Sequence, residues 1–367
     1  MAVGLAPGGA GAANALSQRS CSKYQYKRAE GRKLLFFFVL ILGTVLLAAW
    51  ATVQGFAEIS LADVGASVLA KLFPGHFHTT PFTDMIVWDM RLHRILMSIG
   101  AGAGLGLAGA VVQGILKNPL ASPFTLGISS AASFGAALAI VLGVGVAAGS
   151  WLVIGNAFVF SLLSAFAVFG LARYKGISSE TLILAGIAVM YLFSALTSFL
   201  QYAGKSEQVH EVVFWMMGSM GRSSWEAAGM IFLVFALCFP YLLVSSWDLN
   251  AIGAGDETAA SLGVNVEKKR IVCMMLSSLL TASVICFTGT IGFIDLVSPH
   301  IAGMVVGKDH RFLLPGSALI GALLLLAADT VSRLIFSPAI LPVGIMTSFV
   351  GVPFFIYLFI KQRNTFW

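Results

Sequence analysis

Charged residues are scarce in this chain: Asp, Glu, Lys and Arg make up 10% of its 367 residues, against 58% hydrophobic residues. An average soluble domain contains roughly 25% charged residues. Three stretches, 34–53, 95–116 and 231–244, contain no charged residue at all. Because a helix that crosses a hydrocarbon core needs roughly 20 apolar residues, the sequence excludes an ordinary soluble fold and predicts a membrane protein.

Motifs for catalysis, metal binding and nucleotide binding are also missing. The sequence contains no HExxH and no GxSxG motif, and its four cysteines form neither a CxxC pair nor a disulfide framework. The piece Gly204-Lys205-Ser206 resembles the end of a phosphate-binding loop, but Phe199 stands where the leading glycine is needed. We therefore expect no enzyme activity, no metal site and no cofactor on this chain. Any ATP that drives it, with its Mg²⁺, must bind to another subunit.

The apolar stretches divide into about ten spans of membrane-crossing length, which predicts an all-α, polytopic membrane protein. They lie at 34–54, 94–116, 124–146, 151–173, 181–203, 227–246, 268–288, 292–306, 313–335 and 343–361. Residues 34–367 then form a single transmembrane domain, preceded by a basic, disordered cytoplasmic tail at 1–33. Glycines repeat through 100–109. They formally match a dinucleotide-binding fingerprint, but the required strand and acidic residue are absent, so they predict close packing of helices.

The basic residues indicate how the chain is oriented. If the N-terminus is cytoplasmic and the spans alternate, 16 of the 22 Lys and Arg residues fall on the cytoplasmic side. This asymmetry agrees with the positive-inside bias. An even number of spans returns the C-terminus to the cytoplasm. The net charge of +6 therefore reflects membrane topology, and we expect membrane lipid and no nucleic acid among the partners.

Two loops are longer than simple turns between spans. The outside loop at 201–224 contains Trp215 and predicts a short helix near the outer surface. The cytoplasmic loop at 248–270 contains two acidic residues, then apolar residues and a glycine. This order is typical of a short capped helix over about 254–264. A short helix held on the cytoplasmic side suits docking to a partner protein.

Several motifs follow one another from about residue 91 to residue 360. They are Arg91-Leu-His-Arg94, Gly109-Ala-Val-Val-Gln113, Asn118-Pro-Leu-Ala121, Leu126-Gly-Ile-Ser129, Phe214-Trp-Met-Met-Gly-Ser219, Glu257-Thr-Ala, Ser261-Leu-Gly-Val264, Val297-Ser-Pro-His300, Asp309-His-Arg311, Leu341-Pro-Val-Gly344 and Gly351-Val-Pro-Phe-Phe355. In this order they resemble the FecCD-type permeases, the membrane subunits of ATP-binding-cassette (ABC) importers for iron-siderophore complexes, haem or cobalamin. The resemblance implies a type II ABC importer fold in a bacterial or archaeal plasma (inner) membrane.

The same resemblance implies a set of partners. These are a second permease copy in a homodimer or a paired different half, two ATPase subunits, and a periplasmic or lipid-anchored substrate-binding protein. At the outer face, Arg91, Arg94 and Arg333 would dock the binding protein, because guanidinium groups pair with carboxylates in a bidentate way. The alternative is that Arg91 and Arg94 are interfacial anchors. Arg333 would then pair with Asp329, one turn earlier.

On the cytoplasmic side, the resemblance implies a coupling helix and a gate. The coupling helix, which would fit into the ATPase, contains Asp256, Glu257, Ala260, Leu262 and Gly263; the alternative is a solvated loop. The gate would consist of the turns after the second span and before the fifth, with Asn118, Pro119, Leu120, Ser178 and Ser179. Asparagine and proline also break helices for local reasons, so a purely structural turn is the alternative there.

Two further residues are candidates for the transport pathway. An ionisable side chain at membrane depth is costly and often functional, which singles out Asp295 unless it lies at the outer interface. His300 is the second candidate, with hydrogen-bonded packing as the alternative.

Together these features predict a permease that moves a metal chelate inward by alternating access, fed by a binding protein and driven by separate ATPase subunits. The alternative is a secondary transporter driven by an ion gradient, which needs an acidic site near the midplane. Asp295 and Asp329 are the candidates for such a site. The sequence does not choose among iron-siderophore, haem, cobalamin and molybdate as cargo.

Overall fold

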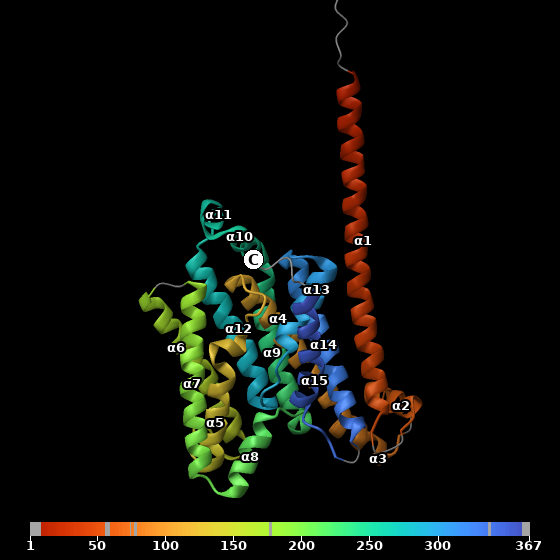
Figure 1. The fold of residues 1–367 in the computed structure, drawn as a ribbon. Coiled ribbons are helices and arrows are strands. Elements are labelled where there is room, and N and C mark those ends of the chain that lie inside the picture. The colour runs from red at the N-terminus through yellow and green to blue at the C-terminus, as the bar shows by residue number, and fades with distance from the viewer. Residues whose placement is uncertain are drawn as a thin grey trace, which may run out of the picture.

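The computed structural model describes residues 9–55, 59–73, 75–76, 79–175, 178–336 and 339–361. Over these residues the chain consists of helices and the turns between them, without a strand (Figure 1). The prediction of an all-α protein is therefore confirmed.

Ten apolar helices correspond to the ten predicted spans. Within the described residues, seven helical segments are long and apolar enough to cross a membrane, and three shorter apolar helices accompany them. The long segments lie in α1 (Gly9–Val53), α4 (His93–Leu116, preceded by helical turns from Pro81), α6 (Leu152–Lys175), α7 (Ser179–Ala203), α9 (Trp225–Val244), α12 (Val266–Thr288) and α14 (His310–Ile335). The shorter helices are α5 (Ile128–Leu142), α13 (Ile294–Val306) and α15 (Val343–Lys361).

Short helices cover the two ends of the bundle. One end, here called the α8 end, carries α2 (Leu61–Leu72), α3 (Pro81–Asp84) and α8 (Ser206–Met216). The opposite end, here called the α11 end, carries α10 (Ser246–Ala254) and α11 (Asp256–Ser261). Figure 1 shows these groups at opposite ends, with the start of α1 on the α11 side. The predicted short helix in 201–224 is thus present as α8.

The structure differs from the sequence-based expectation at two helix boundaries. The backbone of α1 is helical from Gly9, through most of the segment for which the sequence predicts a disordered tail. That segment is rich in Ala, Gln, Lys and Arg, which have high helix propensity. The span predicted at 124–146 is shortened to α5, because Gly143 adopts a left-handed conformation with φ of 66° and ends the helix.

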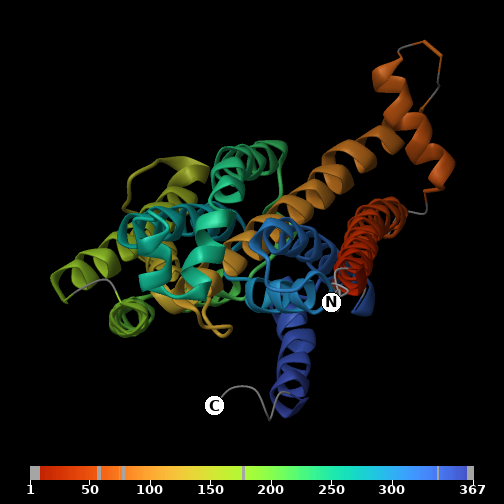
Figure 2. The same ribbon diagram turned by 90° about the horizontal axis from the view of Figure 1, so that it is seen from above.

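The central helix α4 packs against α14, α12, α13 and α9, and Figure 2 shows it running through the middle of the bundle. Its glycines allow neighbouring backbones to approach it. A Cβ atom on Gly102 would overlap the backbone carbonyl of Gly321 in α14, and one on Gly109 would overlap that of Asp295 in α13. The prediction that these glycines serve close helix packing is confirmed.

Candidate functional site

The segment predicted as a coupling helix contains a protruding helix of six residues, Asp256–Ser261, at the α11 end. The coupling role itself stays a prediction. The helix is bounded by Gly255 with φ of 131° and Gly263 with φ of 84°, values that favour glycine. The sequence predicts one helix over 254–264, whereas the structure ends α10 at Ala254 and begins α11 after the glycine. The glycine pair therefore isolates a single short helix between two turns.

The outer face of α11 is accessible. Leu262, directly after the helix, is 69% exposed, and Glu257 and Ala260 are also exposed. Ala259 is fully buried and faces the rest of the chain. With Gly263, which is exposed too, four of the five residues predicted to contact an ATPase are accessible on one protrusion.

Asp256, the first residue of α11, joins three parts of the chain. Its carboxylate accepts a hydrogen bond of 2.7 Å from Nζ of Lys117, the residue that follows α4. It also accepts hydrogen bonds of 3.1 and 2.9 Å from Nη2 of Arg270, in α12. The hydrogen bond from Lys117 lowers the pKa of Asp256, and the charge of Arg270 lowers it further. The carboxylate is therefore ionised and held on both sides at neutral pH.

The first predicted gate turn follows Lys117 directly. The backbone of Lys117 adopts the left-handed conformation, with φ of 51°, and its N–H donates to the carbonyl of Gln113. Oδ1 of Asn118 accepts a 2.9 Å hydrogen bond from the backbone N–H of Leu120. The Leu120 side chain is 52% exposed. The turn is thus locally ordered, and an apolar side chain projects from it.

The second predicted gate turn precedes α7. Oγ of Ser178 accepts a 3.2 Å hydrogen bond from the backbone N–H of Thr181 and caps the helix. Ser178 and Ser179 are both half-buried. The start of α7 lies toward the α11 end, as Figure 1 shows. The cap gives Ser178 a local structural role, and a gating role for Ser178 and Ser179 stays a prediction.

Asp295 and His300 lie on α13. Asp295 is fully buried, accepts a hydrogen bond from Oγ of Ser122, and contacts α4 at Gly109. Its Oδ1 has no hydrogen-bond partner among the described residues. The His300 ring packs 6.2 Å from the ring of Phe355. Asp295 therefore lies inside the bundle, and its hydrogen bond joins it to the segment that follows the first predicted gate turn.

The three arginines predicted to dock a binding protein form a buried cluster toward the α8 end. Nε of Arg94 donates to both oxygens of Asp329 at 3.1 Å, and its Nη2 donates at 2.8 Å. Nε of Arg333 lies 3.4 Å from the same carboxylate. Nη1 of Arg91 donates to the backbone carbonyls of Thr52 at 2.5 Å and Val53 at 2.9 Å.

These contacts bear on the predicted docking role. The side chains of Arg94 and Arg333 are only 10% and 11% exposed, and Arg91 is buried as well. The alternative for Arg333, a pair with Asp329 one turn earlier, is present in the structure. Docking of a binding protein by these arginines stays a prediction.

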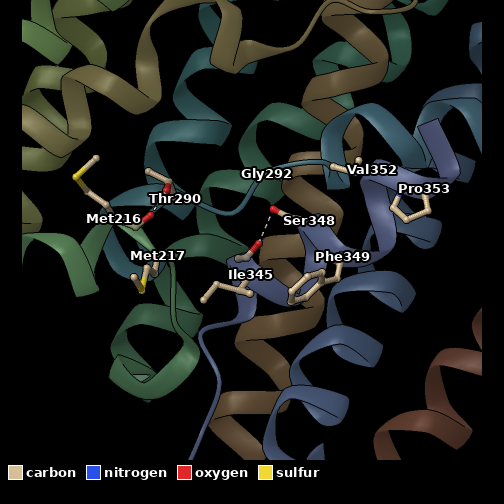
Figure 3. Close-up of a pocket in the computed structure, with 10 residues that line it drawn as sticks. Met216, Met217, Thr290, Gly292, Ile345, Ser348, Phe349, Val352 and Pro353 are labelled. Atoms are coloured by element: carbon tan, nitrogen blue, oxygen red, sulfur yellow. Dashed lines mark hydrogen bonds between the residues drawn. The ribbon is translucent and has the colours of Figure 1, made fainter. Parts of the chain in front are cut away.

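A separate pocket of about 620 Å³ lies beside α15. Its lining, shown in Figure 3, is largely apolar and comprises Met216, Met217, Thr290, Gly292, Gly344, Ile345, Ser348, Phe349, Val352 and Pro353. The two hydroxyls in this lining are engaged, because Thr290 donates to the carbonyl of Met216 and Ser348 donates to that of Gly344. The pocket contains none of the residues predicted for docking, coupling or gating.

Sequence reasoning missed the ion pairs that organise the α11 end. From the sequence, Lys117 and Arg270 indicated only the membrane topology, and no role was predicted for Ser122. Lys117 and Asp256 are 139 positions apart, so no local spacing rule could have paired them. The available signal was qualitative: Lys117 and Arg270 both fall on the side of the membrane predicted for the acidic start of α11.

The fold and this protruding end define a class, the polytopic helical permeases of transporters. The FecCD transport family matches residues 38–361, and the chain belongs to this family. It is therefore a multi-pass integral membrane protein, a permease subunit of the ABC transporter type.

Individual relatives cover most of the chain. The hemin transport system permease protein HmuU of Yersinia pestis is 36% identical over 348 residues, which is 92% of this chain and 98% of that protein. The cobalamin import system permease protein BtuC of Halobacterium salinarum is 38% identical over 297 residues, 80% of this chain and 78% of that protein. A solved ABC transporter in an inward-facing conformation, assigned to the metal-chelate type, matches with a TM-score of 0.78 and 34% identity, over 89% of this chain and 98% of that one.

Proposed function

We propose that this chain is the permease of an importer that moves a metal chelate or a tetrapyrrole such as hemin or cobalamin into the cell. Two permease copies would stand above two ATPase subunits and receive cargo from an external binding protein. The α11 end would face the cytoplasm, in the plasma (inner) membrane of a bacterium or archaeon. Each part of this assembly goes beyond family membership and is open to test.

The exposed helix α11 is the observation that carries the proposal. Its outward residues, Glu257, Ala260 and Leu262, are not used by the chain's own core, while Ala259 anchors it from behind. An exposed large apolar side chain among charged neighbours suits a protein interface. Lys117 and Arg270 at this end agree with a cytoplasmic position under the positive-inside bias.

Alternating access would follow from the preference of the ATPase for one conformation of the permease. A ligand or partner shifts a two-state equilibrium only if it binds the two states with different affinity. ATP binding and hydrolysis on the partners would supply that difference at α11. The permease would contribute the two conformations and the pathway, without an ATP site of its own.

Docking to the ATPase can be tested with Leu262→Asp. The chain and its ATPase are expressed together, and the complex is isolated through a tag on the ATPase. We expect Leu262→Asp to reduce the co-purified permease at least about tenfold, since a charge in a buried interface site costs more than about 1.4 kcal/mol. Leu61→Asp is the matched control, because Leu61 on α2 is 60% exposed but lies at the opposite end. Equal recovery of both variants would contradict the proposal.

Orientation can be tested independently with a single cysteine at position 262. In a Cys21→Ser background, Leu262→Cys should react with a membrane-impermeant maleimide in inverted vesicles and not in intact cells. The other native cysteines, Cys238, Cys273 and Cys286, are buried. Labelling of intact cells would place α11 outside and reject the proposed coupling to a cytoplasmic ATPase.

Cargo transport separates an ATP-driven importer from an ion-driven carrier. Proteoliposomes with the permease alone, or with its ATPase and binding protein, are supplied with hemin, cyanocobalamin or ferric citrate. We expect uptake of one of these only with the complete complex and ATP. Uptake by the permease alone under a proton or sodium gradient would favour the secondary transporter. Asp329, one of the two acidic candidates for that mechanism, forms an ion pair with Arg94 at 2.8 Å.

A further inference from the structure

The gate turn after α4 is held at both of its ends by side chains from other elements. At one end, Lys117 donates to Asp256, which begins α11. At the other end, Ser122 donates to Asp295, in α13. Asn118, Pro119 and Leu120 lie between these two anchors. The turn therefore bridges the exposed protrusion and the interior of the bundle.

The two anchors differ in how firmly they are built. Asp295 is fully buried, and its backbone meets Gly109 of α4 without an intervening side chain. Close backbone contact of this kind leaves little room for relative movement. By contrast, the side chains of Lys117 and Asp256 are 35% and 44% exposed. The anchor at Ser122 is accordingly the fixed one, and the anchor at Lys117 is the one that can follow α11.

Lys117 is well placed to pass a displacement of α11 to the turn. Its backbone closes α4 in the left-handed conformation, with its N–H bonded to Gln113, and the turn begins at the next residue. A pull on its ammonium group therefore acts on the backbone at the start of the turn. Arg270 holds the same carboxylate from α12, so α11 moves against two helices at once.

We propose that Lys117 is a positioning residue that couples the exposed helix α11 to the turn Asn118–Leu120. In this mechanism the ATPase displaces α11, the Lys117–Asp256 ion pair moves the start of the turn, and the Ser122–Asp295 hydrogen bond holds its far end. Leu120, which projects from the turn, changes its surroundings as a result. This inference rests on the proposed function, because it requires an ATPase that binds α11.

The test measures the turn directly. Leu120→Cys in a Cys21→Ser background serves as the reference chain, purified in complex with its ATPase in nanodiscs. The labelling rate of Cys at position 120 by a charged maleimide is compared without nucleotide and after trapping with ATP and vanadate. We expect the reference rate to change by about tenfold, the size of response that a shift between two conformations produces. ATP hydrolysis is measured on the same samples.

Removing the ion pair should remove the response. With Lys117→Met, at a residue outside the predicted ATPase contact, the nucleotide-dependent change should fall below about twofold, while the complex is retained and ATP hydrolysis continues. Asp256→Asn should show the same loss of response. The double variant should lose no more than Asp256→Asn alone, because that variant already removes the interaction with Lys117. Lys117→Arg should retain the response, since it keeps the charge.

Lys269→Met is the matched control. Lys269 pairs with Asp248 at 2.7 Å on the same end of the bundle. The other contacts of its ammonium group are with Ser245 and Tyr241, which lie outside α11 and the gate turn. This variant should respond like the reference chain.

The outcomes separate the two proposals. If the reference chain binds no ATPase, or if its labelling rate does not change with nucleotide, the proposed function is overturned and this inference with it. A reference chain that responds, together with an undiminished response of Lys117→Met, overturns only the inference. Loss of the ATPase from Lys117→Met also overturns it, since Lys117 would then act in docking and not in coupling.

Discussion

The carboxylate of Asp329 is the group whose removal should destabilise this protein most clearly. Asp329 has no solvent exposure, and it faces Arg94 at 2.8 Å and Arg333 at 3.4 Å. Both guanidinium groups are themselves about nine-tenths buried. Asp329→Asn preserves the shape of the side chain and removes its charge. Two buried cations would then remain without their counter-ion.

The expected magnitude follows from the burial of the partners. Removing one partner of a buried ion pair costs about 3–5 kcal/mol, because the remaining charge is desolvated and uncompensated. At about 2 °C per kcal/mol, a value suited to large domains, Asp329→Asn should lower the apparent melting temperature by roughly 6–10 °C. Asp248→Asn is the control. Its pair with Lys269 is about a quarter to a third exposed, so the loss should stay within about 1 kcal/mol.

Thermal unfolding of the purified permease in detergent, followed by size-exclusion chromatography after heating, measures this difference. The double variant Arg94→Met with Asp329→Asn removes one of the two stranded cations. It should lose less stability than the sum of the two single variants, because the residues interact directly. If Asp329→Asn melts within about 2 °C of the wild type, or if the two losses simply add, the reasoning from an uncompensated buried charge is refuted.

Two further predictions concern packing and pH. Gly109→Ala should cost about 1–3 kcal/mol of stability, because the new Cβ would overlap the carbonyl of Asp295. Gly170→Ala is the control and should be neutral in the same melting assay, because a Cβ there would have nothing within 4 Å. Equal melting of both variants would contradict the close packing at Gly109. Because Lys117 lowers the pKa of Asp256 from its ordinary 3.8, their ion pair contributes its stability in full above that value and loses it only as the pH falls through the lowered pKa. The labelling response of the gate turn should therefore be the same at pH 5.5 and pH 8, and a response that disappears at pH 5.5 would argue against a carboxylate anchor.

Much of the fold could be predicted because the spans depend on local composition. Runs of about 20 apolar residues are a property of neighbouring positions, and all ten predicted spans have a helix. The residues that end helices are local signals as well. Gly263 bounds the predicted coupling helix, as its position in the sequence predicts. The misjudged boundaries had local causes too: at Gly143 a left-handed glycine ends α5 early, and before residue 34 helix propensity extends α1.

The candidate site was predicted only in part, and the reason is the distance along the chain between its members. The sequence identified Asp256 as the start of a helix and Asn118 as a turn. It could not show that Lys117 joins them, since that contact depends on how α4, α11 and α12 pack. Arg91, Arg94 and Arg333 show the same limit of prediction from the sequence. Their charge suggested an exposed docking surface. The one-turn spacing offered the Arg333–Asp329 pair as an alternative, whereas the burial of the three arginines and the pair of Arg94 with Asp329 depend on packing.

The amino-acid sequence alone established a polytopic helical bundle, the positions of its helices and a protruding segment with a glycine at its end. These properties follow from hydrophobicity and backbone preference, which act over neighbouring residues. Three-dimensional packing was needed to establish which polar side chains meet: Lys117 with Asp256, Arg94 with Asp329, and Ser122 with Asp295. A buried polar group needs a partner wherever in the chain that partner lies, and the identity of the partner depends on which helices are adjacent in the folded protein.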